Sequence, residues 1–313
     1  MHIPVLLQEV IELLQPHAGG IYIDATIGAG GHAAAILMAS APDGQLFGLD
    51  QDSGTLEIAA RHLAEFGDRV HLLHSNFKYL NQVAKRSNIP QADGILFDLG
   101  VSSMQFDQPE RGFSFQQRGP LDMRMNPLSN VSAADLVNHL PEEELANLIY
   151  KYGEERHSRR IARAVVKARP VDNTVDLAEI VARAIYTGRG KKRRPGAGRI
   201  HPATRTFQAL RIAVNDELQV LEQVLPQAIK QLKPGGRLAV ISFHSLEDRI
   251  VKLYFKQEAQ DCICLPEQLV CTCKHKATID IITKKPITPS LAEIDANPRA
   301  RSAKLRVVGL KRM

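Results

Sequence analysis

Gly20-Ile-Tyr-Ile-Asp-Ala-Thr-Ile-Gly-Ala-Gly-Gly-His32 is the stretch that decides the fold of this chain. It predicts a short buried strand over Ile21 to Ala25, then a glycine-rich turn, then a helix over Gly31 to Ser40. A glycine turn between a strand and a helix suits a nucleotide-type cofactor, because the first N–H groups of the helix can bind an anionic group. The stretch therefore predicts an enzyme with an adenosine-bearing cofactor.

Three acidic residues, Asp24, Asp50 and Asp98, each close an apolar run within the first hundred positions. The runs predict strands that alternate with helices. The further strands are Gln45 to Asp50, Val70 to Ser75 and Gly94 to Leu99, and the further helices are Ser53 to Phe66, with Ser53 as N-cap, and Lys78 to Ser87. This alternation predicts an α/β fold with a doubly wound, mostly parallel, Rossmann-like sheet that brings the three carboxylates to one edge.

The alternation stops after Val101, and helical patterns cover Ser132 to Ala168 and Val175 to Tyr186. A long helical pattern over Thr204 to Leu232 then leads through Lys233-Pro-Gly-Gly236 into a fifth strand, Arg237 to Phe243, and Ala303 to Leu310 closes the sheet. We therefore expect a cofactor-binding core over 1–105 and 200–313, interrupted by an inserted helical domain over 106–199.

Composition places the chain among ordinary globular proteins, with 313 residues, 44% hydrophobic and 24% charged. It lacks an apolar run near the ~20 residues that a membrane span needs, and its first residues do not resemble a secretory signal. A cytoplasmic protein without a membrane partner is expected. The net charge of +6 and the pI near 9.1 favour a polyanionic partner.

The glycine turn is ambiguous by itself. Gly28-Ala-Gly-Gly-His-Ala33 satisfies the dinucleotide pattern, and Asp50 lies at the distance of a ribose-binding acid, so a nicotinamide oxidoreductase is an alternative. Two features favour an S-adenosylmethionine methyltransferase instead. Asp24 precedes the turn where dinucleotide folds have apolar residues, and Lys233-Pro-Gly-Gly236 is the turn typical before the fifth methyltransferase strand. A non-enzymatic RNA-binding or ribosome-assembly module is the second alternative.

Longer motifs make the resemblance specific. They are Asp98-Leu-Gly-Val-Ser-Ser103, Arg111-Gly-Phe-Ser-Phe115, Gly119-Pro-Leu-Asp-Met-Arg-Met125, Tyr152-Gly-Glu-Glu-Arg156, His201-Pro-Ala-Thr-Arg-Thr-Phe-Gln-Ala-Leu-Arg211, Ile241-Ser-Phe-His-Ser-Leu-Glu-Asp-Arg249 and Asn297-Pro-Arg-Ala-Arg-Ser302. Nearly end to end, the chain resembles the bacterial ribosomal RNA small subunit methyltransferase H family. The resemblance implies a class I methyltransferase core that uses S-adenosyl-L-methionine. It also implies methylation of the exocyclic N4 of one cytidine in 16S ribosomal RNA near the decoding P site, with the small ribosomal subunit as partner and not DNA.

The resemblance also implies the residues that contact the cofactor, which are Gly30, Gly31, His32, Asp50, Phe77, Asp98 and Gln105. The chemistry of the residues agrees for several of them. Backbone N–H groups of Gly30, Gly31 and His32 at a helix start suit the methionyl carboxylate. Asp50 can accept the hydrogen bonds of a ribose diol, and Phe77 can pack on adenine. For His32 we expect the backbone, rather than the side chain, to matter.

Asp98 is the expected catalytic residue. A cytosine N4 amine is a poor nucleophile because its lone pair is delocalised into the ring, so an acceptor must take its protons and hold it in line with the methyl group. Amino-group methyltransferases usually follow this position with prolines and an aromatic residue, whereas this chain has Leu99-Gly-Val-Ser-Ser103. The aromatic that stacks on the base stays open among Phe106, Phe113 and Phe115, and His244 and Ser245 are secondary candidates.

Basic residues concentrate in the predicted insertion. Arg156, Arg159, Arg160, Arg163, Lys167 and Arg169 follow one helical pattern, and Arg189-Gly-Lys-Lys-Arg-Arg194 and Arg199 lie in a glycine-rich loop. A solvated helix face could account for the first group, but the neighbouring basic loop favours contact with RNA phosphates.

All four cysteines lie in Cys262-Ile-Cys264 and Cys271-Thr-Cys273. Two pairs of this kind could hold a structural zinc ion, although C-x-x-C is the commoner spacing. A reduced loop without metal is the alternative, and we assign no metal to the active site.

Overall fold

The computed structural model describes residues 4–186, 201–265, 267–268 and 270–312. The chain divides into two compact units, one formed by Met1–Gly100 with Leu218–Met313 and the other by Val101–Glu217. The predicted insertion, 106–199, is therefore shorter at both ends than the second unit. Residues 200–217, which we assigned to the core, belong to the second unit because the helix over Thr204–Asn215 packs in its hydrophobic core.

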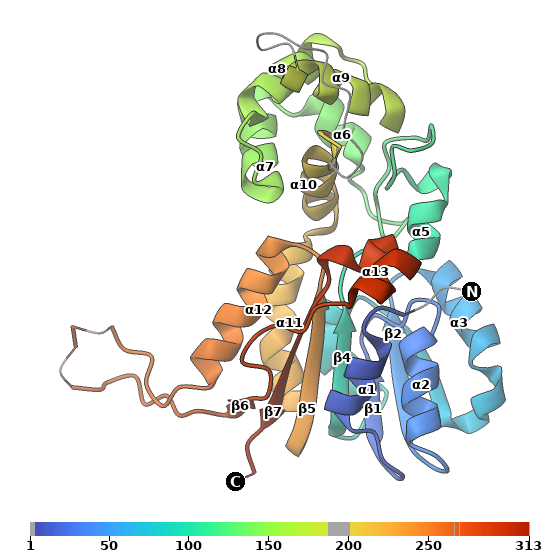
Figure 1. Cartoon of the computed structure of the whole chain (residues 1–313), viewed down its shortest axis with the longest axis vertical. Coiled ribbons are helices and arrows are strands. Elements are labelled where there is room, and N and C mark those ends of the chain that lie inside the picture. The colour runs from blue at the N-terminus through green and yellow to red at the C-terminus, as the bar shows by residue number, and fades with distance from the viewer. Residues whose placement is uncertain (1–3, 187–200, 266, 269, 313) are drawn as a thin grey trace. The chain divides into compact units, whose positions relative to one another are not determined.

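The first unit is built on a seven-stranded sheet in the order β3-β2-β1-β4-β5-β7-β6 (Figure 1). The strands are β1 (Ile21–Asp24), β2 (Gln45–Asp50), β3 (Val70–His74), β4 (Ala92–Asp98), β5 (Leu232–Ser242), β6 (Ile279–Ile281) and β7 (Lys304–Leu310). Strands β1 to β5 are parallel to one another, and β7 is antiparallel to both β5 and β6. The predicted α/β, doubly wound, mostly parallel fold is confirmed.

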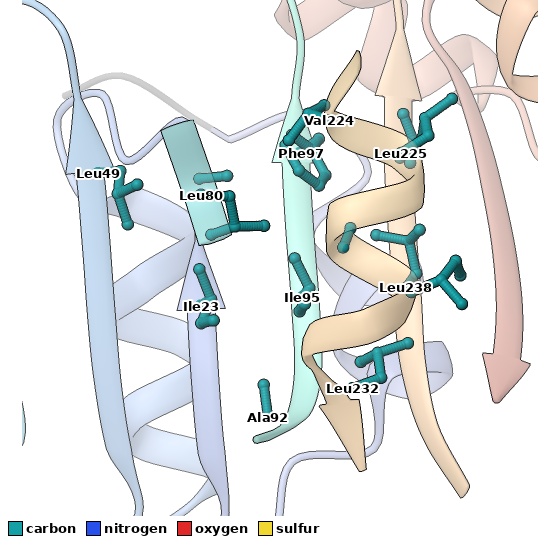
Figure 2. Close-up of a cluster of buried hydrophobic side chains, with 14 of the residues drawn as sticks. Ile23, Leu49, Leu80, Ala92, Ile95, Phe97, Val224, Leu225, Leu232 and Leu238 are labelled. Atoms are coloured by element: carbon teal, nitrogen blue, oxygen red, sulfur yellow. The ribbon is translucent and has the colours of Figure 1, made fainter. Parts of the chain in front are cut away.

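Helices cover both faces of this sheet. They are α1 (Leu7–Leu14), α2 (Gly31–Ala39), α3 (Ser53–His62), α4 (Leu80–Arg86), α11 (Glu217–Gln231) and α12 (Ser245–Glu258). A further short helix of this unit, α13 (Leu291–Ala296), has no buried residue. Neighbouring strand residues point to opposite faces, so Tyr22 packs with α1, α2 and α3 while Ile23 packs with α4, α11 and α12. Figure 2 shows the second of these clusters, with Phe97 of β4 beside Val224 of α11.

Several predicted boundaries were wrong, and one strand was not predicted. The N-cap of α3 is Asp52, not Ser53, because the Asp52 carboxylate accepts the N–H of Gly54 at 3.0 Å. The long pattern over Thr204 to Leu232 is two helices, since Asp216 adopts a left-handed conformation with φ of 49°. Strand β5 begins at Leu232 rather than Arg237, and the short strand β6 was not predicted.

The second unit is helical. It contains α5 (Ser103–Asp107), α6 (Ala133–His139), α7 (Glu142–Gly153), α8 (Ser158–Lys167), α9 (Thr174–Tyr186) and α10 (Thr204–Asn215). Its core is a separate apolar cluster that includes Leu145, Ile161, Val181 and Leu210. In the described part of the chain, no helix combines the length and the apolar character needed to cross a membrane.

Candidate active site

The sheet topology brings three carboxylates to one edge. Strands β2, β1 and β4 are adjacent and parallel, and Asp50, Asp24 and Asp98 are their last residues. Parallel strands place their carboxyl ends on the same side, which is where open α/β sheets bind ligands. The structure thus confirms the prediction that these three acids share one edge.

The glycine turn after β1 is tied to the second of these acids. The Asp50 carboxylate accepts the N–H of Gly28 at 3.2 Å through Oδ2 and the N–H of Asp52 at 3.0 Å through Oδ1. Gly30 has a φ of 84° and is the N-cap of α2. Its N–H donates to the carbonyl of Ile27 at 2.8 Å. The expected anion-binding N–H of Gly30 is therefore already engaged, and such a site would begin at Gly31.

The glycines of this turn differ in how much room their surroundings would leave for a side chain. A Cβ on Gly31 would lie 2.4 Å from Cγ of Pro4, and one on Gly30 would lie 3.0 Å from Cδ1 of Leu63. A Cβ on Gly28 would have its nearest neighbour, the carbonyl oxygen of Thr26, at 3.8 Å. Gly28, with a φ of 52°, is thus the glycine of the turn that borders open space, where a ligand can approach the backbone.

The backbone of Asp98 is hydrogen-bonded to Thr26, while one oxygen of its carboxylate has no hydrogen-bond partner among the described residues. Its backbone N–H donates to Oγ1 of Thr26 at 2.6 Å. Its side chain is 26% exposed, and Oδ2 lies 3.6 Å from Nδ1 of His32. Oδ1 is buried and has no hydrogen-bond partner among the described residues. Because an unsatisfied buried oxygen is costly, Asp98 is well placed to accept an N–H from a bound ligand.

The side chain of His32 is part of this arrangement, which the sequence did not indicate. It is buried, with 5% exposed, and Nε2 lies 2.9 Å from the carbonyl of Val5. A carbonyl can only accept, so Nε2 carries a hydrogen, and in the neutral ring the lone pair of Nδ1 is directed to the Asp98 side. His32 therefore contributes its imidazole beside the carboxylate as well as its backbone at the start of α2.

Burial raises the pKa of all three acids. The pKa of Asp98 rises to about 8, with further increases from the charges of Asp24 and Glu247. Burial raises the pKa of Asp24 to about 7, although the N–H of Thr26 opposes the shift. Burial also raises the pKa of Asp50 to about 6, against the N–H groups of Asp52 and Gly28. A cation bound at this edge would favour the charged carboxylates.

Other predicted residues lie in different settings. Phe77 is half-buried in a 3-10 turn, with its ring edge-on to Phe97 at 5.5 Å. Gln105 belongs to the second unit, where it completes the capping box of α5 with Ser102. His244 is the N-cap of α12, and its Nδ1 accepts the N–H of Glu247 at 3.4 Å. His244 thus has a structural role in capping α12.

The aromatic candidates for base stacking differ in burial. Phe113 is 6% exposed in the core of the second unit. Phe115 packs edge-on against Phe207 at 4.8 Å. All three rings contact the apolar core of that unit, with Phe113 buried and Phe106 and Phe115 half-buried.

Two residues that position the edge were missed from the sequence, Thr26 and Glu247. Thr26 follows the strand-end acid by two positions, a spacing that allows its hydroxyl to reach a neighbouring strand. Glu247 occupies the third position of α12, where its carboxylate accepts the N–H of Phe243 at 2.8 Å. A capping pattern over His244 to Glu247 was the available signal.

The raised pKa of Asp98 predicts how the stability of the ligand-free protein depends on pH. The pKa of an Asp in the unfolded chain is ~3.9, so the Asp98 carboxyl keeps its proton up to a higher pH in the folded state than in the unfolded state. The free energy of unfolding should therefore fall as the pH rises from about 4 to about 8. The substitution Asp98→Asn should reduce this loss of stability. Urea unfolding at about pH 5 and about pH 9 should therefore show that the free energy of unfolding of the variant, relative to that of the wild type, is higher at about pH 9 than at about pH 5.

Asp248 supplies the contrasting variant. Although burial opposes it, hydrogen bonds from Arg306 and Lys304 lower the pKa of Asp248. This group stabilises the fold at higher pH and loses that contribution as the pH falls through its lowered pKa. Both test pH values lie above the pKa of an unfolded Asp, so Asp248→Asn should trail the wild type by about the same free energy of unfolding at about pH 5 and about pH 9. Parallel trends in the two variants would contradict the assigned shift of Asp98.

Known proteins resemble the chain over nearly its whole length. The model of the MraW methylase family matches residues 1–311. Ribosomal RNA small subunit methyltransferase H of Heliobacterium modesticaldum is 52% identical over 309 residues, which cover 97% of each chain. The protein of the same name from Symbiobacterium thermophilum is 54% identical over 310 residues, covering 98% of this chain and 96% of its own. By both measures, the chain belongs to the MraW methylase family.

Proposed function

We propose that this protein transfers a methyl group from S-adenosyl-L-methionine to the exocyclic N4 of a specific cytidine in 16S ribosomal RNA, near the decoding P site. Family membership makes the chain a methyltransferase and displaces the nicotinamide oxidoreductase alternative. The names of its relatives support ribosomal RNA of the small subunit as the substrate. The N4 position and its place near the P site rest on the motif resemblance and on the chemistry of the edge.

The residues at the edge fit S-adenosyl-L-methionine. The Asp50 carboxylate makes one hydrogen bond through each oxygen, so it retains acceptor capacity for a ribose diol. The open space beside Gly28 allows a ligand to approach the turn, and the first turn of α2 can face a carboxylate. We propose Gly30, Gly31, His32, Asp50, Phe77, Asp98 and Gln105 as the cofactor contacts, with Gly30 acting through the shape of the turn. When bound, the cofactor supplies an electrophilic methyl group on a positively charged sulfur.

Asp98 is proposed as the residue that binds and orients the target amine. The unpartnered, buried Oδ1 is the single observation that supports this role most strongly. By accepting one N–H of the amine, Asp98 would turn the nitrogen lone pair out of conjugation with the ring. Thr26 fixes the backbone from which this carboxylate extends, because its Oγ1 accepts the N–H of Asp98 at 2.6 Å.

The same carboxylate is suited to receive a proton. In the reaction a nitrogen–carbon bond forms, the sulfur–carbon bond breaks with its electron pair going to sulfur, and the nitrogen loses one proton. An acceptor works best when its pKa lies near the working pH, and burial raises the pKa of Asp98 to about 8. Asp98 is the proposed acceptor of that proton.

The second unit is proposed to hold the RNA. Helix α8 buries Ile161, Ala162 and Val165. Its opposite surface is basic and exposed, with Arg159, Arg160, Arg163 and Lys167, and Arg156 lies just before it. Two of these side chains have protein partners, since Arg160 donates to the carbonyl of Ile185 and Arg163 pairs with Glu142 at 3.3 Å.

Arg169 does not belong to the basic surface. It donates to the carbonyls of Val137 and Leu140 and so connects α6 to the end of α8. The basic loop over 189–199 lies outside the residues that the structure describes. The proposed phosphate-binding set in the described residues is therefore Arg156, just before α8, with Arg159 and Lys167 on α8, together with the two paired arginines.

Neutralising this set predicts a change in the salt dependence of RNA binding. Replacing Arg156, Arg159 and Lys167 by Gln should reduce the slope of log K against log salt by about 2, at ~0.7 per lost phosphate contact. Binding of 16S RNA fragments at several salt concentrations would measure this. Lys85, Lys230 and Lys256 are exposed on the first unit, and Gln at these positions is the matched control with the same change in net charge. Equal slopes for both triple variants would contradict the RNA assignment.

The substrate is tested by mapping the modified base. Mass spectrometry of 16S RNA should find one cytidine that gains an N4-methyl group when the gene is present and lacks it when the gene is deleted. Purified small subunits and naked 16S RNA from the deleted strain, each incubated with the protein, would distinguish an assembled subunit from free RNA as the partner. We place the reaction in the cytoplasm, where that RNA is assembled. Unchanged cytidines would overturn the proposal.

A further inference from the structure

The segment between α12 and β6 has almost no hydrophobic core of its own. Figure 1 shows it as a loop that extends away from the sheet. No described residue from 260 to 276 is buried. Leu265 and Val270 are 73% and 71% exposed. Burial of apolar side chains therefore contributes little to ordering the described residues of this segment.

The four cysteines meet within this segment. Cys262, Cys264, Cys271 and Cys273 have all four sulfur atoms within 4.8 Å of one another. The Sγ atoms of Cys262 and Cys271 are 3.5 Å apart, those of Cys271 and Cys273 are 3.6 Å apart, and those of Cys273 and Cys262 are 3.8 Å apart. Two C-x-C stretches that are separate in the sequence thus converge on one point.

The three separations among Cys262, Cys271 and Cys273 match one face of a tetrahedron around a single ion, and the Cys264 sulfur lies within 4.8 Å of each of them. With zinc–sulfur bonds of about 2.3 Å, tetrahedral geometry places the sulfur atoms about 3.8 Å apart. A disulfide would require about 2.05 Å, and all four cysteines are free thiols. The arrangement is therefore neither a pair of disulfides nor a scatter of unrelated side chains.

Backbone N–H groups support the sulfur atoms. The N–H groups of Ile263 and His275 each donate to Sγ of Cys273 at 3.5 Å, and that of Cys264 donates to Sγ of Cys262 at 3.5 Å. Such bonds stabilise negative charge on sulfur, as expected for the surroundings of a metal-bound thiolate.

We propose that Cys262, Cys264, Cys271 and Cys273 bind one zinc ion as a structural tetrathiolate site. Four thiolates in a closed tetrahedron suit zinc and leave no position for a substrate. The ion would cross-link the two ends of the Cys262–Cys273 loop and replace the missing hydrophobic core. This site is separate from methyl transfer and does not depend on the proposed RNA substrate.

His275 is not a ligand, although it lies two residues after Cys273. Its Nδ1 is 2.8 Å from the carbonyl of Gln260, and its Nε2 is 3.6 Å from the carboxylate of Glu258. Both ring nitrogens are thus directed to protein oxygen atoms. This makes His275→Gln a matched control for the cysteine variants, because it changes a metal-binding residue type in the same segment.

Metal analysis of the whole chain tests the site. The protein should be purified under reducing conditions without a chelator or a polyhistidine tag. We expect about one zinc ion per chain in the wild type and in His275→Gln, and less than about a tenth of that in Cys264→Ser and Cys271→Ser. Reduced, zinc-free wild type should take up cobalt(II) and develop the visible absorption of a tetrahedral thiolate complex.

A second measurement does not require the variants to fold. Removing zinc from the wild type with a chelator should speed proteolytic cleavage within residues 260–277 and leave the sheet intact, and adding zinc should restore protection. The proposal is overturned if the purified wild type holds no zinc and takes up no cobalt. Two disulfides in place of four titratable thiols would overturn it as well.

Discussion

Replacing Asp98 by Asn should lower the rate of methyl transfer by about 10³-fold, the range for loss of a positioned proton acceptor. The amide keeps the size of the side chain and one acceptor oxygen, but it cannot take the proton that the amine releases. Affinity for S-adenosyl-L-methionine, measured by calorimetry, should change far less than the rate. Single-turnover assays on the RNA substrate would separate the chemical step from binding.

The matched control for this variant lies on the same strand. Asp93 is near the start of β4, where its carboxylate accepts the N–H of Ile21 at 2.8 Å and pairs with Lys233 at 2.7 Å. Asp93→Asn makes the same chemical change at the opposite end of β4 and should leave the rate of transfer within a few-fold of the wild type. If Asp98→Asn kept full activity, the proposed active site would be wrong.

Replacing Asp50 by Ala should weaken binding of S-adenosyl-L-methionine by about 10²-fold or more, because two hydrogen bonds to a charged group are lost. The variant also leaves the N–H groups of Gly28 and Asp52 without their acceptor, which loosens the turn that borders the ligand. Calorimetric titration would measure the loss. The effect should fall on cofactor affinity, and saturating cofactor should recover much of the rate.

Asp43 provides the comparison for this second variant. It lies before β2, and its carboxylate accepts the N–H of Gly19 at 2.7 Å. Asp43→Ala removes an acid with a similar backbone hydrogen bond, yet from the opposite end of the strand, so cofactor affinity should stay near the wild-type value. Equal affinities for Asp50→Ala and the wild type would remove Asp50 from the proposed contacts.

The edge of the sheet could be predicted because short-range signals agreed there. An apolar run that ends in an acid, followed by a glycine turn, constrains the strand, its direction and its last side chain together. Asp24, Asp50 and Asp98 were located in this way. Their contacts were not predicted, because the approach of the His32 side chain to Asp98 and the hydrogen bond from Asp98 to Thr26 depend on how separate segments pack.

Other features depended on conformations that the residue pattern does not specify. The helical pattern through Asp216 continues without a break in apolar spacing, yet that residue turns left-handed and ends α10. Strand β6, which follows the cysteine loop, has three residues. A strand of this length is too short to give a periodic signal in the sequence. The cysteine spacing allowed zinc but favoured a reduced loop without metal, and the distances between sulfur atoms are what favour a metal site.

The order of the strands also has a consequence for how the chain folds as it is synthesised. β4 lies between β1 and β5, but the whole Val101–Glu217 unit is made before β5 appears. Until then one side of β4 is an open edge that can pair with other chains. The Val101–Glu217 unit is continuous in sequence, so it can complete its own core before the sheet of the first unit is complete. Nascent protein should therefore be most prone to aggregate, and most dependent on chaperones, in the interval before Leu232–Ser242 leaves the ribosome.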